Sequence, residues 1–249
     1  MALAVPLACG SGQPASGPGG RRSVLNVSAA SSLTEAFTTI KDRFEHVHPE
    51  VKVVLNFGAS SELVQQLKAG SPTDVLATAD DKTMKQATDG GLVDPPVTFA
   101  RNRLAILVAA GNPKRIESLA DLDSGKVTFV LCAPEVPCGR SGRQLLDKAG
   151  VKAEPKSLEP NVKAAVTRVT TGEVDAAIVY VTDAKAAASS SSAKAQGVAI
   201  PPNLNVTTAY PIAVAKATKR AAAAEEFTAY VNSPAARNVL TGDGFLPPS

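Results

Sequence analysis

Small hydroxyl-bearing residues and glycines gather where predicted strands give way to predicted helices. Ser31-Ser32 follows one apolar run, and Gly58-Ala59-Ser60-Ser61 follows the next. Pro137-Cys138-Gly139 and Pro160-Asn161-Val162 occupy similar positions later in the chain. The first turn of a helix carries backbone N–H groups without intrahelical partners and a partial positive charge. Several such turns around one cleft could therefore bind an anion without any Lys or Arg.

Each of these turns also has a structural interpretation. Serine and asparagine are ordinary N-cap residues, and Ser32 followed by Glu35 fits a capping box. Gly139 would let the backbone approach a ligand closely. Tyr180 fits a half-buried strand aromatic equally well. An anion site is favoured because the turns recur at the carboxyl ends of successive strands, where open α/β sheets bind ligands. The pattern does not identify the anion.

The order of the predicted elements indicates an α/β fold. Alternating apolar residues predict strands at residues 25–29, 51–57, 74–77, 127–131, 176–181 and 209–214. Helical spacing predicts helices at residues 33–44, 63–67, 82–88, 142–149, 162–171, 221–231 and 235–240. The apolar run at residues 103–109 is long enough to leave one lobe and enter another.

Length and composition narrow the class of protein. The 249 residues suffice for two compact lobes, and the apolar fraction of 44% is ordinary for a globular protein. The formal net charge of +3 is spread without a dense basic run, so no nucleic acid partner is expected. His46 and His48 are interpreted as surface residues, because the sequence clusters no further ligands near them. No residue is predicted to bind a metal directly.

Residues 1–22 differ from the rest of the chain. A short apolar run ends in small residues, and Cys9 opens a stretch rich in Gly, Ser and Pro, which is typical of an export signal followed by a tether. Leu7-Ala8-Cys9 resembles the lipobox of bacterial lipoproteins, although Pro6 stands where a branched aliphatic residue is usual. The alternative is an incidental cysteine. No later segment has about 18 consecutive apolar residues, so the body of the protein is not predicted to span a membrane.

Several ordered motifs resemble those of the periplasmic molybdate-binding proteins. They are Ala29-Ala30-Ser31-Ser32-Leu33-Thr34, Phe57-Gly58-Ala59-Ser60-Ser61-Glu62-Leu63, Val136-Pro137-Cys138-Gly139, Pro160-Asn161-Val162 and Ile178-Val179-Tyr180-Val181-Thr182-Asp183-Ala184. The resemblance extends from Leu25 to Phe245. It implies a two-lobe, type II periplasmic-binding-protein fold with the ligand cleft between the lobes.

The resemblance also implies which groups hold a molybdate or tungstate ion. They are the hydroxyls of Ser32, Ser60 and Tyr180 and the main-chain N–H groups of Ser60, Cys138 and Val162. The doubled Ser31-Ser32 and Ser60-Ser61 leave open which serine of each pair faces the anion. The family commonly has Ala where this chain has Cys138, which matters little for a backbone donor.

Lobe boundaries and partners follow from the same resemblance. The first lobe would comprise residues 23–102 and 208–249, the second residues 103–207, and residues 1–22 a signal remnant and tether. Crossings near Arg103 and Asn205 would form a hinge that closes on the anion. The protein would be an exported, membrane-anchored lipoprotein. It would act as a monomer that delivers its ligand to the permease of an ABC importer, with no cofactor and no catalytic residue.

A disulfide between Cys132 and Cys138 is predicted. An exported protein meets an oxidising compartment, and the two cysteines bracket a short Pro-containing loop. The bridge would hold the Cys138 N–H in place before the anion arrives. The alternative is two reduced thiols.

Other functions fit the sequence less well. Within the same class, the ligand could be sulfate, phosphate or ferric iron, although an iron receptor needs tyrosine or carboxylate neighbours that Tyr180 lacks. An enzyme on the same fold is disfavoured, because no His lies near a Ser and no Gly-x-Ser-x-Gly or phosphate-binding loop occurs. A sensor fused to a DNA reader is disfavoured, because the tether takes the place of a helix-turn-helix. Molybdate and tungstate are not distinguished.

Overall fold

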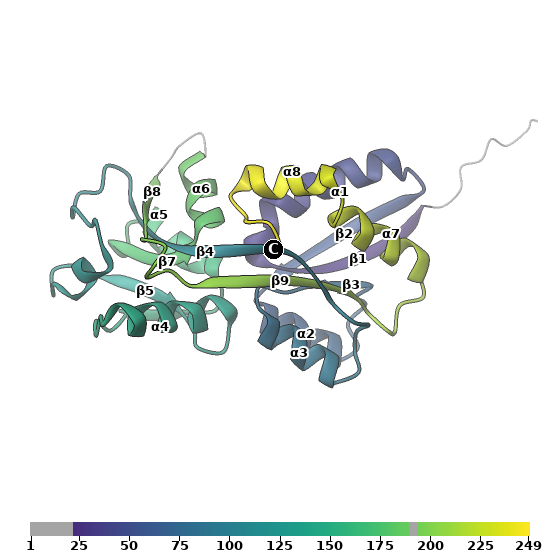
Figure 1. Ribbon diagram of the computed structural model, residues 1–249, viewed down its shortest axis with the longest axis horizontal. Helices are drawn as coiled ribbons and strands as arrows, with labels where there is room; N and C mark the ends of the chain where they lie inside the picture. The colour runs from purple at the N-terminus through teal and green to yellow at the C-terminus, as the bar shows by residue number, and fades with distance from the viewer. Residues whose placement is uncertain (1–21, 190–193) are drawn as a thin grey trace, which may run out of the picture.

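Two α/β lobes lie side by side along the long axis of the molecule (Figure 1). The computed structural model describes residues 22–189 and 194–249. One lobe contains β1, β2 and β3 with the C-terminal helices, and the other contains the middle of the chain. Strands β4 and β9 run along the axis between them.

The strands are β1 (Ser23–Ala30), β2 (Val51–Gly58), β3 (Val75–Ala77), β4 (Val97–Ala109), β5 (Phe129–Cys132), β6 (Ser157–Glu159), β7 (Ala176–Tyr180), β8 (Ala195–Ala199) and β9 (Thr207–Val214). The α-helices are α1 (Thr34–Val47), α2 (Ser60–Lys68), α3 (Asp81–Asp89), α4 (Pro137–Ala149), α5 (Val162–Thr170), α6 (Val181–Ser189), α7 (Ala221–Val231) and α8 (Pro234–Asp243). Two 3₁₀ turns, η1 (Ser31–Leu33) and η2 (Leu119–Asp123), complete the described elements. The strand order is β2-β1-β3-β9-β4-β7-β5-β6, with β8 also on β4.

The first lobe packs α1, α7 and α8 on one side of its sheet and α2 and α3 on the other (Figure 1). The buried residues of α1 recur at helical spacing, so one face of the helix enters the core. Phe37 and Phe44 on that face meet Phe227 of α7 edge-on, with ring centroids 6.2 and 5.2 Å apart. This aromatic cluster fixes α1 within the first lobe, and Ser32 lies in η1, directly before that helix.

The second lobe is built around strands covered on both faces. Every residue of β5 and of β7 is buried, which is typical of parallel strands between two layers of helices. These strands pair in parallel, and β7 pairs antiparallel with the second half of β4. Because β5, β6 and β7 are parallel neighbours along the sheet, the segments that follow them reach one edge of this lobe.

The chain crosses between the lobes at two adjacent points. Residues 97–103 of β4 pair with β9, whereas residues 104–108 pair with β7. The side chain of Asn205 joins the two crossings, because its Oδ1 accepts the N–H of Leu104 at 3.0 Å and its Nδ2 donates to the Leu104 carbonyl at 2.9 Å. A hinge at this place would therefore bend both crossings together.

The structure differs from the sequence predictions at several elements. Helix α4 begins at Pro137, whereas its start was predicted at residue 142. Strands β6 and β8 and helix α6 have no counterpart among the predictions. The two strands are only three and five residues long, too short for periodicity to show. Helix α6 follows β7 without an intervening turn signal.

Candidate functional site

A small cavity lies between the lobes and is lined from both. Its volume is about 210 Å³, counted out to its mouth. Its walls include every residue predicted to hold the anion, namely Ser32, Ser60, Cys138, Val162 and Tyr180. No charged side chain lines it in the described part of the chain. The site therefore offers neutral hydrogen-bond donors at the starts of helices and no opposing charge.

Ser60 is the first residue of α2 and is buried, at 1% exposure. Its Oγ accepts a hydrogen bond from the backbone N–H of Ala79 at 3.0 Å. Because a backbone N–H can only donate, the hydroxyl hydrogen of Ser60 is left to donate into the cavity. Ser61 lines a separate, more open hollow. Of this pair, the geometry favours Ser60.

Ser32 is positioned by a tertiary contact and not by helix capping. It belongs to η1, and neither η1 nor α1 has a side-chain cap. The capping box predicted for Ser32 and Glu35 is therefore wrong. The Ser32 Oγ instead lies 2.8 Å from the hydroxyl of Tyr210 on β9. Ser31 lines the same cavity as Ser32.

Tyr180 ends β7 with its hydroxyl buried. This hydroxyl makes no hydrogen bond of normal geometry within residues 22–189 and 194–249. Burial, with smaller contributions from Tyr210, Asp80 and Asp183, raises the pKa of Tyr180 well above its usual value, so the group stays a donor. A buried hydroxyl without a partner costs about 1–3 kcal/mol. A bound acceptor in the cavity would remove that cost.

The turn at Cys138 is the first turn of α4 and is bridged to β5. Cys132 and Cys138 form a disulfide with their Cα atoms 5.6 Å apart. A Cβ on Gly139 would lie 1.9 Å from the carbonyl oxygen of Ala133. Gly139 thus allows α4 to pack against the loop after β5, and Gly139 is not among the described residues that line the cavity. The bridge and this packing together hold the Cys138 N–H at the cavity.

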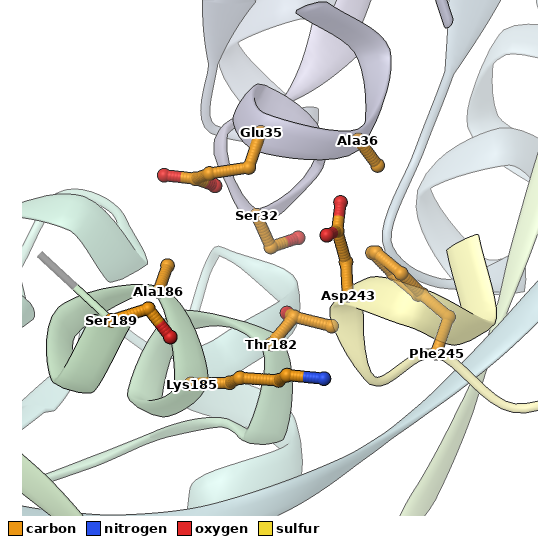
Figure 2. Close-up of a pocket in the computed structure, with 9 residues that line it drawn as sticks. All are labelled: Ser32, Glu35, Ala36, Thr182, Lys185, Ala186, Ser189, Asp243 and Phe245. Atoms are coloured by element: carbon orange, nitrogen blue, oxygen red, sulfur yellow. The ribbon is translucent and has the colours of Figure 1, made fainter. Parts of the chain in front are cut away.

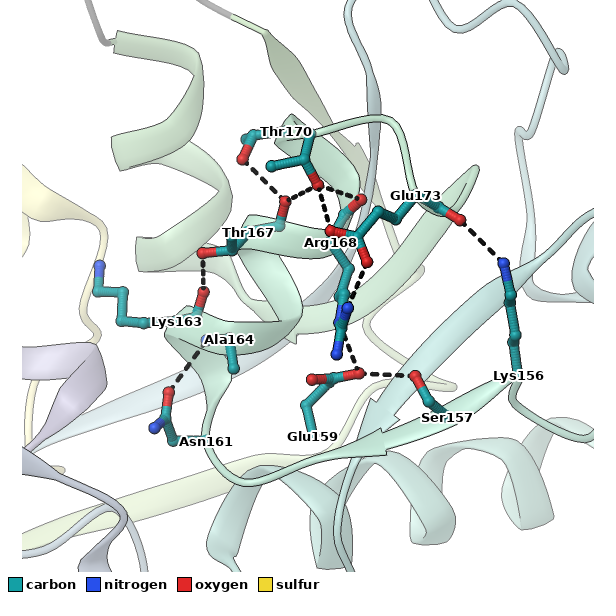
Figure 3. A network of polar contacts seen from close by, with 11 residues as sticks. Lys156, Ser157, Glu159, Asn161, Lys163, Ala164, Thr167, Arg168, Thr170 and Glu173 are labelled. Carbon is teal, nitrogen blue, oxygen red and sulfur yellow. Dashed lines mark hydrogen bonds and ion pairs between the residues drawn. The ribbon is translucent and has the colours of Figure 1, made fainter.

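The start of α5 is fixed by a cap and an ion-pair network (Figure 3). Asn161 caps the helix, because its Oδ1 accepts the N–H of Ala164 at 3.0 Å. Arg168 joins the helix to the buried carboxylate of Glu159 on β6 at 3.2 Å and also pairs with Glu173. The N–H of Val162 belongs to the first turn, so it has no intrahelical acceptor and is free for a ligand.

Two ion pairs cross from lobe to lobe beside the cavity. Arg140 of α4 contacts the Asp80 carboxylate at 2.6 Å, and Asp80 also caps α3. Lys163 of α5 contacts Glu35 of α1 at 2.7 Å and Asp183 at 3.2 Å. These pairs bring together charges from lobes that would be separated in an open form.

Asp183 is a fully buried carboxyl group beneath Lys163. Neither of its oxygens receives a well-aligned hydrogen bond in the described residues, although Lys163 is close enough to pair with it. Burial raises the pKa of Asp183 to about 6, against the opposing effect of Lys163. Burial would lower the pKa of Lys163, but Asp183 and Glu35 outweigh it and raise that pKa.

The sequence did not reveal the partners of the predicted donors. Tyr210 and Asn102 lie far from Ser32 along the chain, and no motif includes them. One signal was present for Tyr210. The chain has only three tyrosines, and two of them, Tyr180 and Tyr210, meet beside the cavity with ring centroids 5.9 Å apart.

A wider hollow lies on the other side of Ser32, between α1, α6 and α8 (Figure 2). Its volume is about 650 Å³ counted out to its mouth. The carboxylates of Glu35 and Asp243 face it, and Lys185 is engaged with the carbonyl of Gly242. Burial and the charge of Glu35 raise the pKa of Asp243. Two carboxyl groups make this hollow a poor place for an anion.

The histidines have more neighbours than the sequence indicated. His48 stacks on Phe44 with ring centroids 4.3 Å apart, and its Nδ1 lies 3.5 Å from Glu50 and 3.6 Å from Glu226. The expectation that no further ligands gather near these histidines is therefore wrong, because the fold brings α7 to the end of α1. These side chains are partly exposed, and exposed acidic groups commonly gather without a metal ion.

Cys9 lies outside the described residues. Within residues 22–189 and 194–249, no helix has the length and apolar character needed to cross a membrane.

Two α/β lobes with a cleft of neutral donors between them define a solute-binding protein of the type II periplasmic class. The chain belongs to the family of bacterial extracellular solute-binding proteins, because residues 25–246 match the model of that family. It is 41% identical over 253 residues to the molybdate-binding protein ModA of Mycobacterium tuberculosis, covering 100% of this chain and 95% of that protein.

Solved structures show the same fold. The periplasmic molybdate-binding protein of Azotobacter vinelandii matches with a TM-score of 0.80 and 22% identity, over 90% of this chain and 100% of that one. The sulfate-binding protein SubI of Mycobacterium tuberculosis matches with a TM-score of 0.81 and 19% identity, over 91% of this chain and 87% of that one. Receptors named for different tetrahedral anions thus share this fold, so the anion must be assigned from the site.

Proposed function

We propose that this protein is the extracytoplasmic receptor for molybdate, with tungstate as an equivalent ligand, and that it supplies an ABC importer. One observation carries the proposal. Neutral donors from both lobes converge on one cavity that no charged side chain lines in the described residues. The relative at 41% identity is named a molybdate-binding protein.

The donor set suits a fully deprotonated tetrahedral anion. Ser60 and Tyr180 present hydroxyl hydrogens, and the first turns of α2, α4 and α5 present N–H groups. An anion without a proton can accept from all of them. Hydrogen phosphate keeps a proton that would meet another donor, and sulfate is too small to reach donors fixed on both lobes at once.

We further propose that residues 23–102 with 208–249 move as one lobe and residues 103–207 as the other. The division is supported by the change of strand partner within β4 between Arg103 and Leu104 and by the link that Asn205 makes there. Anion binding would close the lobes, and the monomer in its closed form would dock on the permease. Lipidation of Cys9 would anchor the exported protein. We assign it no reaction.

Calorimetric titration of the purified protein with molybdate, tungstate, sulfate and phosphate tests the proposed function. We expect molybdate and tungstate to bind within about ten-fold of each other, which corresponds to about 1.4 kcal/mol. A thousand-fold excess of sulfate or phosphate should leave molybdate bound. Appreciable displacement by either anion would overturn the assignment.

A further inference from the structure

Two buried polar residues are linked to Ser32 by a chain of hydrogen bonds. The hydroxyl of Tyr210 lies 2.8 Å from the Ser32 Oγ, and the Nδ2 of Asn102 lies 3.5 Å from the Tyr210 oxygen. Tyr210 and Asn102 are both fully buried. The Tyr210 ring is held edge-on between Phe99 and Phe245, with centroids 6.4 and 5.2 Å away, so the position of its oxygen is fixed.

The orientation of the Asn102 amide is fixed by its neighbours. Its Oδ1 accepts the backbone N–H of Arg103 at 2.9 Å, and its Nδ2 donates to the Thr182 hydroxyl at 3.0 Å. A backbone N–H can only donate, so the oxygen of the amide must face it. The NH₂ group of Asn102 therefore faces Tyr210, and the Tyr210 oxygen meets a donor.

The direction of the remaining hydrogens follows from this. A hydroxyl has one hydrogen. Of the two hydroxyls next to that of Tyr210, the Ser32 Oγ lies at 2.8 Å with hydrogen-bond geometry, whereas that of Tyr180 makes no hydrogen bond of normal geometry in the described residues, so we assign the Tyr210 hydrogen to Ser32. Ser32 then has its hydrogen left for the cavity. The same outcome arises at Ser60, whose oxygen is occupied by the N–H of Ala79. Both serine oxygens thus accept a hydrogen bond from a group within the protein, Tyr210 at Ser32 and the Ala79 N–H at Ser60, and each serine keeps its own hydrogen to donate into the cavity.

We propose that Tyr210 and Asn102 are positioning residues that fix Ser32 as a hydrogen-bond donor and thereby select against anions that retain a proton. The inference rests on the proposed function, because it assigns the selectivity of the same site. Without the Tyr210 hydroxyl, the Ser32 oxygen is free to accept, and a protonated anion can donate to it.

The test is a double-mutant cycle with Tyr210→Phe and Ser32→Ala, titrated with molybdate and with hydrogen phosphate at neutral pH. Phenylalanine keeps the ring packing, and thermal unfolding of the ligand-free proteins checks that each variant folds. We expect Tyr210→Phe to weaken molybdate binding by about ten-fold or more while phosphate binding stays the same or improves. In the Ser32→Ala background, Tyr210→Phe should not weaken molybdate binding any further, because its effect depends on the Ser32 hydroxyl. Tyr230→Phe, on α7, is the matched control.

The outcomes separate this inference from the proposed function. If the parent protein binds molybdate but Tyr210→Phe weakens both anions alike, or has its full effect in the Ser32→Ala background, Tyr210 is only a structural residue and the inference is overturned. Unchanged molybdate binding by Tyr210→Phe overturns it as well. If the parent protein binds none of the anions, the proposed function is wrong, and the inference that rests on it is wrong as well.

Discussion

Lys163 of α5 lies 2.7 Å from Glu35 of α1. This contact joins α5, which starts at the proposed donor Val162, to α1, which follows the proposed donor Ser32. The two residues come from different lobes, and Lys163 directly follows Val162. Arg140 and Asp80 make the matching contact beside Cys138 at 2.6 Å. Because each pair joins the two lobes, the proposed opening of the lobes would break both, so they should affect how long the anion stays bound.

The first prediction concerns these ion pairs. Glu35→Gln should speed molybdate dissociation about two- to five-fold, the range expected for a partly exposed pair, with little change in association. Arg140→Gln should have a larger effect, because Arg140 and Asp80 are less exposed and share two hydrogen bonds. Stopped-flow displacement measures both rates. Lys85→Gln is the control, since Lys85 pairs with Asp89 within α3. Equal dissociation rates for the ion-pair variants and this control would contradict the prediction.

The second prediction concerns the serines. Ser60→Ala and Ser32→Ala should each weaken molybdate binding by roughly ten- to a hundred-fold, because a hydrogen bond to a charged partner contributes about 1.5–3 kcal/mol. Ser61→Ala should cost less, since Ser61 lies outside the cavity. Ser31→Ala should also cost less. Calorimetry gives the affinities, and parent-like binding by all of these variants would place the anion elsewhere.

The third prediction separates binding from stability at Tyr180. Tyr180→Phe should leave the ligand-free protein as stable as the parent or slightly more stable, because it removes a buried hydroxyl without a partner. The same change should weaken molybdate binding about ten-fold or more, since we propose that the hydroxyl donates to the anion. Thermal unfolding without ligand and titration with ligand measure the two effects. A clear loss of stability in the ligand-free variant would show that the hydroxyl has a partner inside the protein.

The fourth prediction concerns pH. Asp183 is ionised at neutral pH and takes up a proton as the pH falls through about 6. Protonation removes a negative charge beside Lys163, so molybdate should bind about two- to ten-fold more tightly at the lower pH. Asp183→Asn should remove this dependence. Titrations on either side of this pH provide the comparison, and a parallel slope in parent and variant would show that another group is responsible.

Asp183 should also affect folding. Its folded-state pKa is raised above the usual value near 3.8, so the folded protein holds this proton more tightly than the unfolded chain does. The stability that this group contributes is present at acid pH and is lost as the pH rises through about 6. The free energy of unfolding of Asp183→Asn should lack that decline.

The fifth prediction concerns the bridge between Cys132 and Cys138. Closing so short a loop should stabilise the protein by about 2 kcal/mol. Reduction should lower the unfolding temperature and also weaken molybdate binding a few-fold, because the Cys138 N–H is then less firmly placed. Intact mass after alkylation, with and without reductant, shows whether the bridge forms. Two alkylated cysteines in unreduced protein would show that it does not.

The sequence predicts much of the fold because its long elements carry clear periodicity. The alternating residues of β2 and the helical spacing of Phe37, Ile40 and Phe44 in α1 are visible without any structure. The start of α4 is not, because Pro and Gly residues are typical of turns and the packing of Gly139 on Ala133 is a tertiary contact. Short edge strands such as β6 are not predicted, because they contain too few residues to show an alternating pattern.

The site is predicted only in part for a related reason. Motifs mark the residues that we propose to face the ligand, since those residues lie at strand ends. The groups behind them depend on which distant segments meet. Ser32 and Tyr210 are 178 residues apart in the sequence, and the residues around either one do not indicate a contact with the other.

The neutral lining of the cavity has a consequence for the conditions in which the protein can work. Dissolved ions screen the attraction between exposed charges, but they act weakly on donors that are buried and enclosed. Affinity set by helix starts and hydroxyls should therefore change little between dilute and saline media. A cell that carries this receptor could scavenge a trace anion equally well when the salinity of its surroundings varies.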